Sequence, residues 1–213
     1  MSEATAASGP QRRRRLGIFG GTFDPPHVGH LVTAVNVRHE LQLDQVLLMV
    51  SGMPWQKVGT RDLTPAEDRY ALVEAAVGDV EGLEASRLEI DRGGLSFTAD
   101  TLRDVAEAEP DAELFVILGS DAAAGVSTWE RADECRQRAT IVVVDRPGMR
   151  EADPPPGWSW VRVEVPRLEV SSTDLRARVA DGRPLDYLLT PQVIKSIESR
   201  GLYQVGASRE FVR

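Results

Sequence analysis

The chain has 213 residues, of which 42% are hydrophobic and 27% are charged, as expected for one compact domain or a domain with a small appendage. Its single cysteine, Cys135, cannot form an internal disulfide or a zinc cluster, which favours a reducing cytoplasm as the location. The net charge of -8 disfavours a large nucleic-acid-binding face, and no apolar run approaches the roughly 20 residues of a membrane span.

Apolar runs of strand length alternate with helical patterns along the chain. Thr64 is the expected N-cap of one helix, with Pro65 at the first helical position and Glu67 completing a capping box. The alternation predicts an α/β fold with a doubly wound parallel sheet, which places ligands at the carboxyl ends of the strands. In chain order the predicted elements are strand 16–20, helix 28–41, strand 46–50, helix 66–77, strand 83–90, helix 99–108, strand 114–118, helix 128–137, strand 141–144, strand 160–165, helix 173–180 and helix 191–200.

Three regions are distinguished by composition. Residues 1–15 carry four consecutive arginines but no apolar segment of a secretory signal, so a disordered, solvated arm is expected, with a nucleic-acid contact as the alternative. Residues 16–203 are predicted to form one domain with a small helical part from about residue 166, and residues 204–213 a tail. The four prolines within 146–157 mark either a linker inside that domain or the boundary before its helical part.

The segment 20–30 reads GGTFDPPHVGH and lies between the first predicted strand and helix. Gly20 and Gly21 let the backbone approach a ligand, and the N-terminus of the helix favours phosphate. The spacing of His27 and His30 predicts that both imidazoles point the same way, with Gly29 between them leaving room for a bulky group. The alternatives are surface or capping histidines, or a metal pair. A zinc site is not expected, because no Cys or acidic cluster with ligand spacing accompanies the histidines.

This segment resembles the His-x-Gly-His signature of the nucleotidyltransferase superfamily, whose members share a Rossmann-like fold with class I aminoacyl-tRNA synthetases. The sequence Gly-Gly-Thr-Phe-Asp-Pro before His27 resembles the bacterial nicotinate-mononucleotide adenylyltransferases. The resemblance extends from residue 16 to residue 203. It implies transfer of AMP from ATP to nicotinate mononucleotide in NAD biosynthesis, with nicotinate adenine dinucleotide and pyrophosphate as products. It also implies Mg²⁺ bound with ATP.

Residues 170–176, VSSTDLR, are similar to a second signature of the superfamily, Ile-Ser-Ser-Thr-x-Ile-Arg. Ser172 or Thr173 is expected to cap a helix whose N-terminus binds phosphate, and Arg176 can fork onto phosphate oxygens. An ordinary capped helix with a solvated arginine is the alternative.

Residues 96–102, SFTADTL, resemble a family element that contacts the nicotinate carboxylate, a role that falls on Thr98. Asp121, after the apolar strand 114–118, can accept hydrogen bonds from ribose. Trp129 can stack on a pyridine ring or fill the core. Arg146 matches a family arginine near the mononucleotide phosphate, with a solvated loop charge as the alternative.

Residues 54–57, PWQK, resemble a mobile family loop, with Gln56 where a histidine is common and Lys57 as a phosphate contact. The resemblance and the residue chemistry together assign three sets of residues and no dedicated metal ligand. The expected catalytic residues are His27, His30, Lys57 and Arg176. The expected ATP-binding residues are Gly20, Gly21, Thr22, Phe23, Gly119, Asp121, Ser171, Ser172 and Thr173. The expected mononucleotide-binding residues are Trp55, Thr98, Trp129 and Arg146.

Other functions remain open on sequence alone. The acceptor could be nicotinamide mononucleotide or phosphopantetheine, although enzymes of the second kind usually have Thr in place of the first histidine. A non-catalytic nucleotide sensor on the same fold is an alternative of a different class. The expected partners are therefore ATP and nicotinate mononucleotide, without nucleic acid or membrane, and a homo-oligomer is a further option.

Overall fold

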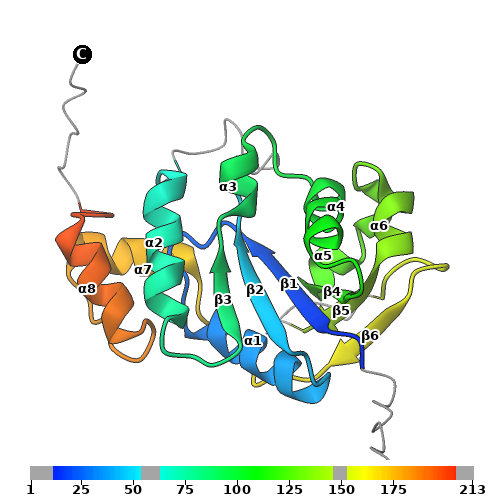
Figure 1. Ribbon diagram of the computed structural model, residues 1–213. Coiled ribbons are helices and arrows are strands. Elements are labelled where there is room, and N and C mark those ends of the chain that lie inside the picture. The colour runs from blue at the N-terminus through cyan, green and yellow to red at the C-terminus, as the bar shows by residue number, and fades with distance from the viewer. Residues whose placement is uncertain (1–11, 54–62, 146–152, 205–213) are drawn as a thin grey trace, which may run out of the picture.

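The structure, a computed structural model, describes residues 12–53, 63–145 and 153–204. Strands and helices alternate along most of the chain (Figure 1). In order they are β1 (Arg15–Gly21), α1 (Val28–Glu40), β2 (Gln45–Val50), α2 (Ala66–Val77), β3 (Leu83–Ser86), α3 (Leu88–Arg92), α4 (Thr98–Ala108), β4 (Glu113–Gly119), α5 (Ser120–Ala123), the 3₁₀ helix η2 (Val126–Thr128), α6 (Ala132–Arg138), β5 (Ala139–Val144), β6 (Trp160–Val163), α7 (Ser172–Asp181) and α8 (Pro191–Ser199).

The described strands form one six-stranded sheet in the order β3-β2-β1-β4-β5-β6. All neighbours pair in parallel, which confirms the predicted doubly wound, Rossmann-like sheet. The chain proceeds from β1 to β2 on one side and from β4 to β5 on the other, so the strand order reverses between β1 and β4. The carboxyl ends of these two strands therefore frame the crevice where such sheets bind ligands.

Two hydrophobic clusters cover the two faces of the sheet. Adjacent strand residues point to opposite faces, so Phe19 belongs to one cluster and Ile18 to the other. The first cluster joins the sheet to α1, α2, α7 and α8, and the second joins it to α4, α5, η2 and α6. Figure 1 shows these two groups of helices on either side of the strands. The C-terminal helices thus share a core with α1 and α2.

Two predicted elements differ from the structure. The strand predicted at 83–90 ends at Ser86, and α3 begins at Leu88. The predicted strand included Leu88 and Ile90, but Glu89 between them is buried and accepts a hydrogen bond from the Thr101 hydroxyl on α4. The helix predicted at 128–137 is interrupted, because Arg131 adopts a left-handed conformation with φ of 53° and α6 starts after it.

The predicted cap of α2 is also wrong. Pro65 is the N-cap, without a side-chain cap, although the helix bounds are as predicted. The Thr64 carbonyl instead accepts from Arg69 Nε at 2.8 Å, and Glu67 pairs with Arg87 at 3.0 Å.

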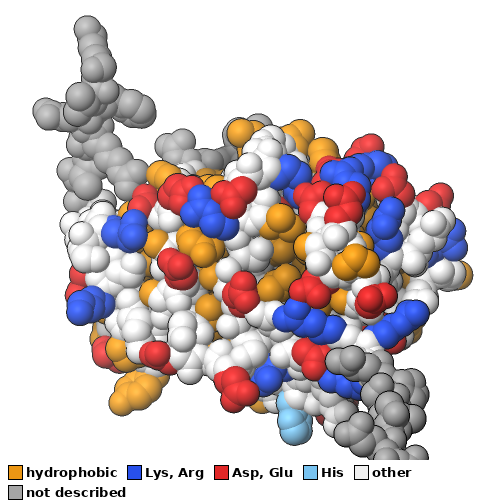
Figure 2. All heavy atoms as spheres, in the orientation of Figure 1, with side chains coloured by type: hydrophobic (Ala, Val, Ile, Leu, Met, Phe, Trp, Pro, Cys, Tyr) orange, Lys and Arg blue, Asp and Glu red, His pale blue; other side chains and the backbone are white. Residues whose placement is uncertain are grey.

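The surface is charged with both signs. On the face shown in Figure 2, acidic and basic side chains lie intermixed around smaller apolar areas. No helix among the described residues is long and apolar enough to cross a membrane.

Candidate active site

The loop between β1 and α1 is built around the buried ring of Phe23. Phe23 is only 2% exposed and has φ of 50°. Its ring meets those of Phe19 and His30 edge-on, with centroids 5.9 and 5.0 Å apart. A Cβ at Gly21 would come within 2.8 Å of the same ring, so this glycine makes room for a protein side chain. Phe23 can therefore offer a ligand only its backbone.

The two histidines of the loop form a stacked pair. His27 is the N-cap of α1, and its ring lies on that of His30 with centroids 3.7 Å apart and an interplanar angle of 28°. The His27 backbone N–H donates to Nδ1 of His30 at 3.1 Å, which orients that ring. The predicted common direction of the imidazoles is confirmed. Gly29 leaves room for His27 itself, since a Cβ there would lie 3.0 Å from its Nδ1.

The second signature contacts this loop directly. Ser172 Oγ donates to the Pro25 carbonyl at 2.8 Å, and Arg176 Nη1 donates to the Asp24 carbonyl at 2.6 Å, across 147 and 152 residues of sequence. The cap of α7 is Ser171, whose Oγ accepts from the Asp174 N–H. The expectation of Ser172 or Thr173 as cap is thus wrong, because Ser172 is engaged with the histidine loop.

A buried arginine that sequence analysis missed also holds the loop. Arg69 on α2 is 1% exposed, and its Nη1 donates to the Thr22 carbonyl at 2.8 Å and its Nη2 to the Gly52 carbonyl at 3.1 Å. The sequence contains a signal for this burial. Arg69 precedes the buried Leu72 and Val73 by three and four positions, so it lies on the apolar face of the helix.

The C-terminal segment reaches the same loop. Tyr203, which follows α8, donates its hydroxyl to Oδ1 of the buried Asp24 at 2.8 Å. Burial and the neighbouring Asp24 carboxylate raise the pKa of Tyr203 far above its usual value, so the phenol stays protonated and remains a donor. No feature of the sequence singled out this pair.

The end of β2 is tied to the beginning of α4. The Gly52 N–H donates to Ser96 Oγ at 3.1 Å, and the Ser96 N–H donates to the Met53 carbonyl at 3.1 Å. Two residues later Thr98 is the first residue of α4, after the N-cap Phe97. A hydrogen bond from Arg131 holds the pKa of Asp100, in the first turn of α4, below its usual value. Thr98 thus lies at a helix N-terminus beside the exit of β2.

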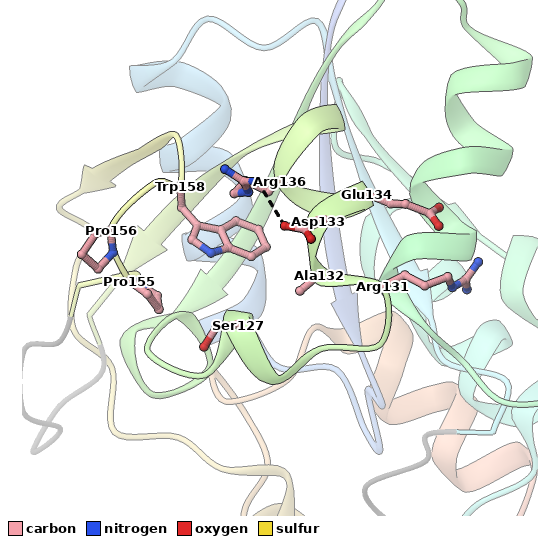
Figure 3. Close-up of a pocket in the computed structure, with 9 residues that line it drawn as sticks. All are labelled: Ser127, Arg131, Ala132, Asp133, Glu134, Arg136, Pro155, Pro156 and Trp158. Carbon is pink, nitrogen blue, oxygen red and sulfur yellow. Dashed lines mark hydrogen bonds and ion pairs between the residues drawn. The ribbon is translucent and has the colours of Figure 1, made fainter.

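Three more of the predicted site residues, Gly119, Asp121 and Trp129, lie at or after the end of β4, the strand next to β1. Gly119 ends β4 and Asp121 lies on α5, both at the carboxyl end of the strand that neighbours β1. Trp129 is half-buried and meets Trp158 edge-on at 6.3 Å. Trp158 lines a surface pocket together with Arg131 and Arg136 (Figure 3). The volume of this pocket is about 560 Å³. Among the described residues, none of the predicted site side chains lines this pocket, so it does not mark the histidine site.

Three nominated residues, Trp55, Lys57 and Arg146, lie outside the described residues, as does Gln56. Within the described ranges no group of three or more His, Cys, Asp or Glu side chains could hold a metal ion. Cys135 lies on α6 with its side chain buried in the core, and burial raises the pKa of its thiol to about 11, which makes it a poor nucleophile.

Comparisons with known proteins agree on one family. The cytidylyltransferase-like family model matches residues 18–178. A protein of Corynebacterium kroppenstedtii named "Probable nicotinate-nucleotide adenylyltransferase" is 47% identical, covering 91% of this chain and 95% of that protein. A protein of the same name from Streptomyces coelicolor is 46% identical, covering 87% and 99%.

Solved structures show the same fold. The Plasmodium falciparum nicotinic acid mononucleotide adenylyltransferase complexed with NaAD has a TM-score of 0.72 at 17% identity, covering 89% of this chain and 97% of that one. The same enzyme complexed with APC has a TM-score of 0.71 at 16% identity.

Proposed function

The chain belongs to the cytidylyltransferase-like family, and we propose that it acts as its relatives are named, as a nicotinate-nucleotide adenylyltransferase. In this reaction a phosphate oxygen of nicotinate mononucleotide attacks the α-phosphorus of ATP. The bond between the α-phosphorus and the bridging oxygen breaks, which gives nicotinate adenine dinucleotide and releases pyrophosphate.

The observation that carries the proposal is the joining of the two signatures. The stacked His27 and His30 begin α1, and Ser172 and Arg176 of the second signature hold the backbone of the preceding loop. Donors from two distant segments therefore converge at the end of β1, beside the reversal of strand order where α/β sheets bind nucleotides.

In this reaction the residues of the site would have to stabilise negative charge. The second pKa of a phosphate monoester is about 6, so the attacking group is already anionic at neutral pH and needs no strong base. Catalysis then depends on positioning and on donors directed at the developing charge and the departing pyrophosphate. We assign His27, His30 and Arg176 to this work. A guanidinium carries five N–H donors, so holding the Asp24 carbonyl is compatible with phosphate contact.

The other nominated residues complete the proposal. Lys57 would neutralise phosphate charge, and Mg²⁺ would arrive as part of the MgATP substrate, without a protein cage among the described residues. ATP would contact the glycine loop, the end of β4 and the start of α7, while the mononucleotide would contact α4 and its surroundings. The ATP set is Gly20, Gly21, Thr22, Phe23, Gly119, Asp121, Ser171, Ser172 and Thr173. The mononucleotide set is Trp55, Thr98, Trp129 and Arg146.

The test is a pyrophosphate-release assay with ATP and MgCl₂, run with nicotinate mononucleotide, nicotinamide mononucleotide and phosphopantetheine in parallel. We expect release with the nicotinate form to exceed release with the others. His30→Ala should lower turnover at least ~100-fold, the scale of losing one preorganised donor. His39→Ala is the matched control, since His39 is exposed on the last turn of the same helix. Absence of release with every acceptor would support a nucleotide sensor instead.

A further inference from the structure

Arg69 connects three segments that lie apart in sequence. Each nitrogen of its guanidinium donates to a different backbone carbonyl: Nη1 to Thr22 after β1, Nη2 to Gly52 after β2, and Nε to Thr64 before α2. All three N···O distances are between 2.8 and 3.1 Å. Burying a guanidinium is costly unless its donors are engaged. Because the group is planar and rigid, its bonds also fix the relative directions of the three carbonyls.

Two of these segments carry opposite sides of the proposed site. Thr22 belongs to the loop that leads to His27 and His30, which is the ATP side. Gly52 is held by Ser96, through its N–H to Ser96 Oγ, and Ser96 leads into Thr98 at the start of α4, which is the mononucleotide side. A chain of contacts therefore runs from the histidine loop through the Arg69 guanidinium to the helix nominated for the acceptor.

We propose that Arg69 is a positioning residue that sets the spacing between the nucleotide-donor side and the acceptor side of the active site. This inference rests on the proposed adenylyl transfer, since the spacing matters only when two substrates must meet in line. Arg69 acts through the backbone of Thr22 and Gly52. Loss of its contacts therefore disturbs the alignment of two bound substrates more than the binding of either one.

The expected signature is a change in kcat without a matching change in KM. Arg69→Lys keeps the charge but has one nitrogen, which cannot reach three carbonyls in three directions. A misplacement of about 1 Å can cost about 100-fold in rate, so we expect kcat to fall at least about tenfold. The KM values for ATP and for nicotinate mononucleotide should each change less than about threefold. Arg69→Gln is a second variant, should the lysine protein not fold.

Leu72→Ala is the matched control for lost stability. Leu72 lies one turn further along α2, is fully buried in the apolar cluster and does not belong to the proposed site. All rates are measured well below the melting temperatures of the variants and are normalised to the fraction that binds ATP. Leu72→Ala should lower the melting temperature while its kcat stays within about twofold of the native value.

Hydrogen exchange supplies a readout that needs no turnover. The Ser51 N–H donates to the Gly21 carbonyl and the Gly52 N–H to Ser96 Oγ. Arg69→Lys should speed exchange at both amides, and Leu72→Ala should not. A native kcat in Arg69→Lys, unchanged exchange at Ser51 and Gly52, or an equal kcat loss in Leu72→Ala would each overturn the inference. If the native chain lacks adenylyl transfer, the proposed function fails, and unchanged exchange would separately exclude the structural connection.

Discussion

Replacing Gly29 by alanine should lower the rate of catalysis while leaving the stability of the fold almost unchanged. A methyl group at this position would lie 3.0 Å from His27 Nδ1 and 3.1 Å from its Cε1. Non-bonded heavy atoms pack best at about 3.5 to 4.0 Å, so the imidazole would have to retreat by about 0.5 Å. Because this ring is stacked on His30 at 3.7 Å, its retreat alters the relation of both rings.

The effect on folding should be small. Alanine gains up to about 1 kcal/mol over glycine in a helix, and an off-rotamer histidine costs about 0.5 to 1.5 kcal/mol. These terms oppose each other, so the melting temperature should stay within about 4 °C of the native value. A misplacement of about 1 Å can cost about 100-fold in rate, so a shift of about half that distance should lower kcat about tenfold.

The assay is pyrophosphate release with ATP and nicotinate mononucleotide, with calorimetry on the same samples. Gly78→Ala is the matched control. Gly78 caps α2 in a helical conformation, and a Cβ there would meet only the Glu74 carbonyl of its own helix, at 3.2 Å. It should keep native kcat. A Gly29→Ala protein with native kcat would refute the reasoning, because the crowded ring would then be irrelevant to turnover.

Three further predictions concern polar groups. Tyr203→Phe removes the donor to the buried Asp24 and should lower the free energy of unfolding by about 1.5 to 3 kcal/mol, measured by urea denaturation. Asp100→Asn should cost up to about 1 kcal/mol at pH 7. The hydrogen bond from Arg131 lowers the Asp100 pKa in the folded state, so this difference should disappear as the pH falls below about 4. Cys135, with its pKa raised to about 11 by burial, should react with iodoacetamide at pH 7.5 only after unfolding, as followed by mass spectrometry.

The sheet could be predicted from sequence because its strands carry a strong local signal. Strands such as β4 and β5 are buried on both faces and read as unbroken apolar runs, and turn residues separate them from helical patterns. Alternation of the two element types then leaves a doubly wound sheet as the natural arrangement. The prediction was wrong at α3, where Glu89 is buried, and at the start of α6, where the backbone of Arg131 is left-handed.

The sequence singled out the residues of the candidate site, but it did not give the contacts that these residues make. The glycines of segment 20–30 were expected to make room for a ligand, but Gly21 and Gly29 make room for the rings of Phe23 and His27. Such contacts depend on which way a ring turns after the chain has packed. Sequence spacing gives the direction of a side chain from its helix but not the neighbour that it meets.

The C-terminal segments contribute to the proposed active site because they contact the histidine loop. Ser172 and Arg176 of α7 hold two successive carbonyls of that loop, at Pro25 and Asp24, and Tyr203 after α8 holds the Asp24 carboxylate. Short local contacts alone do not fix this loop, since Arg69 holds it from 47 positions away and the C-terminal anchors from about 150 or more positions away. Contacts of such separation require the chain to bring segments from its two ends together. The conformation of the histidine loop is therefore held by residues from distant parts of the fold, among them the second signature near the C-terminus.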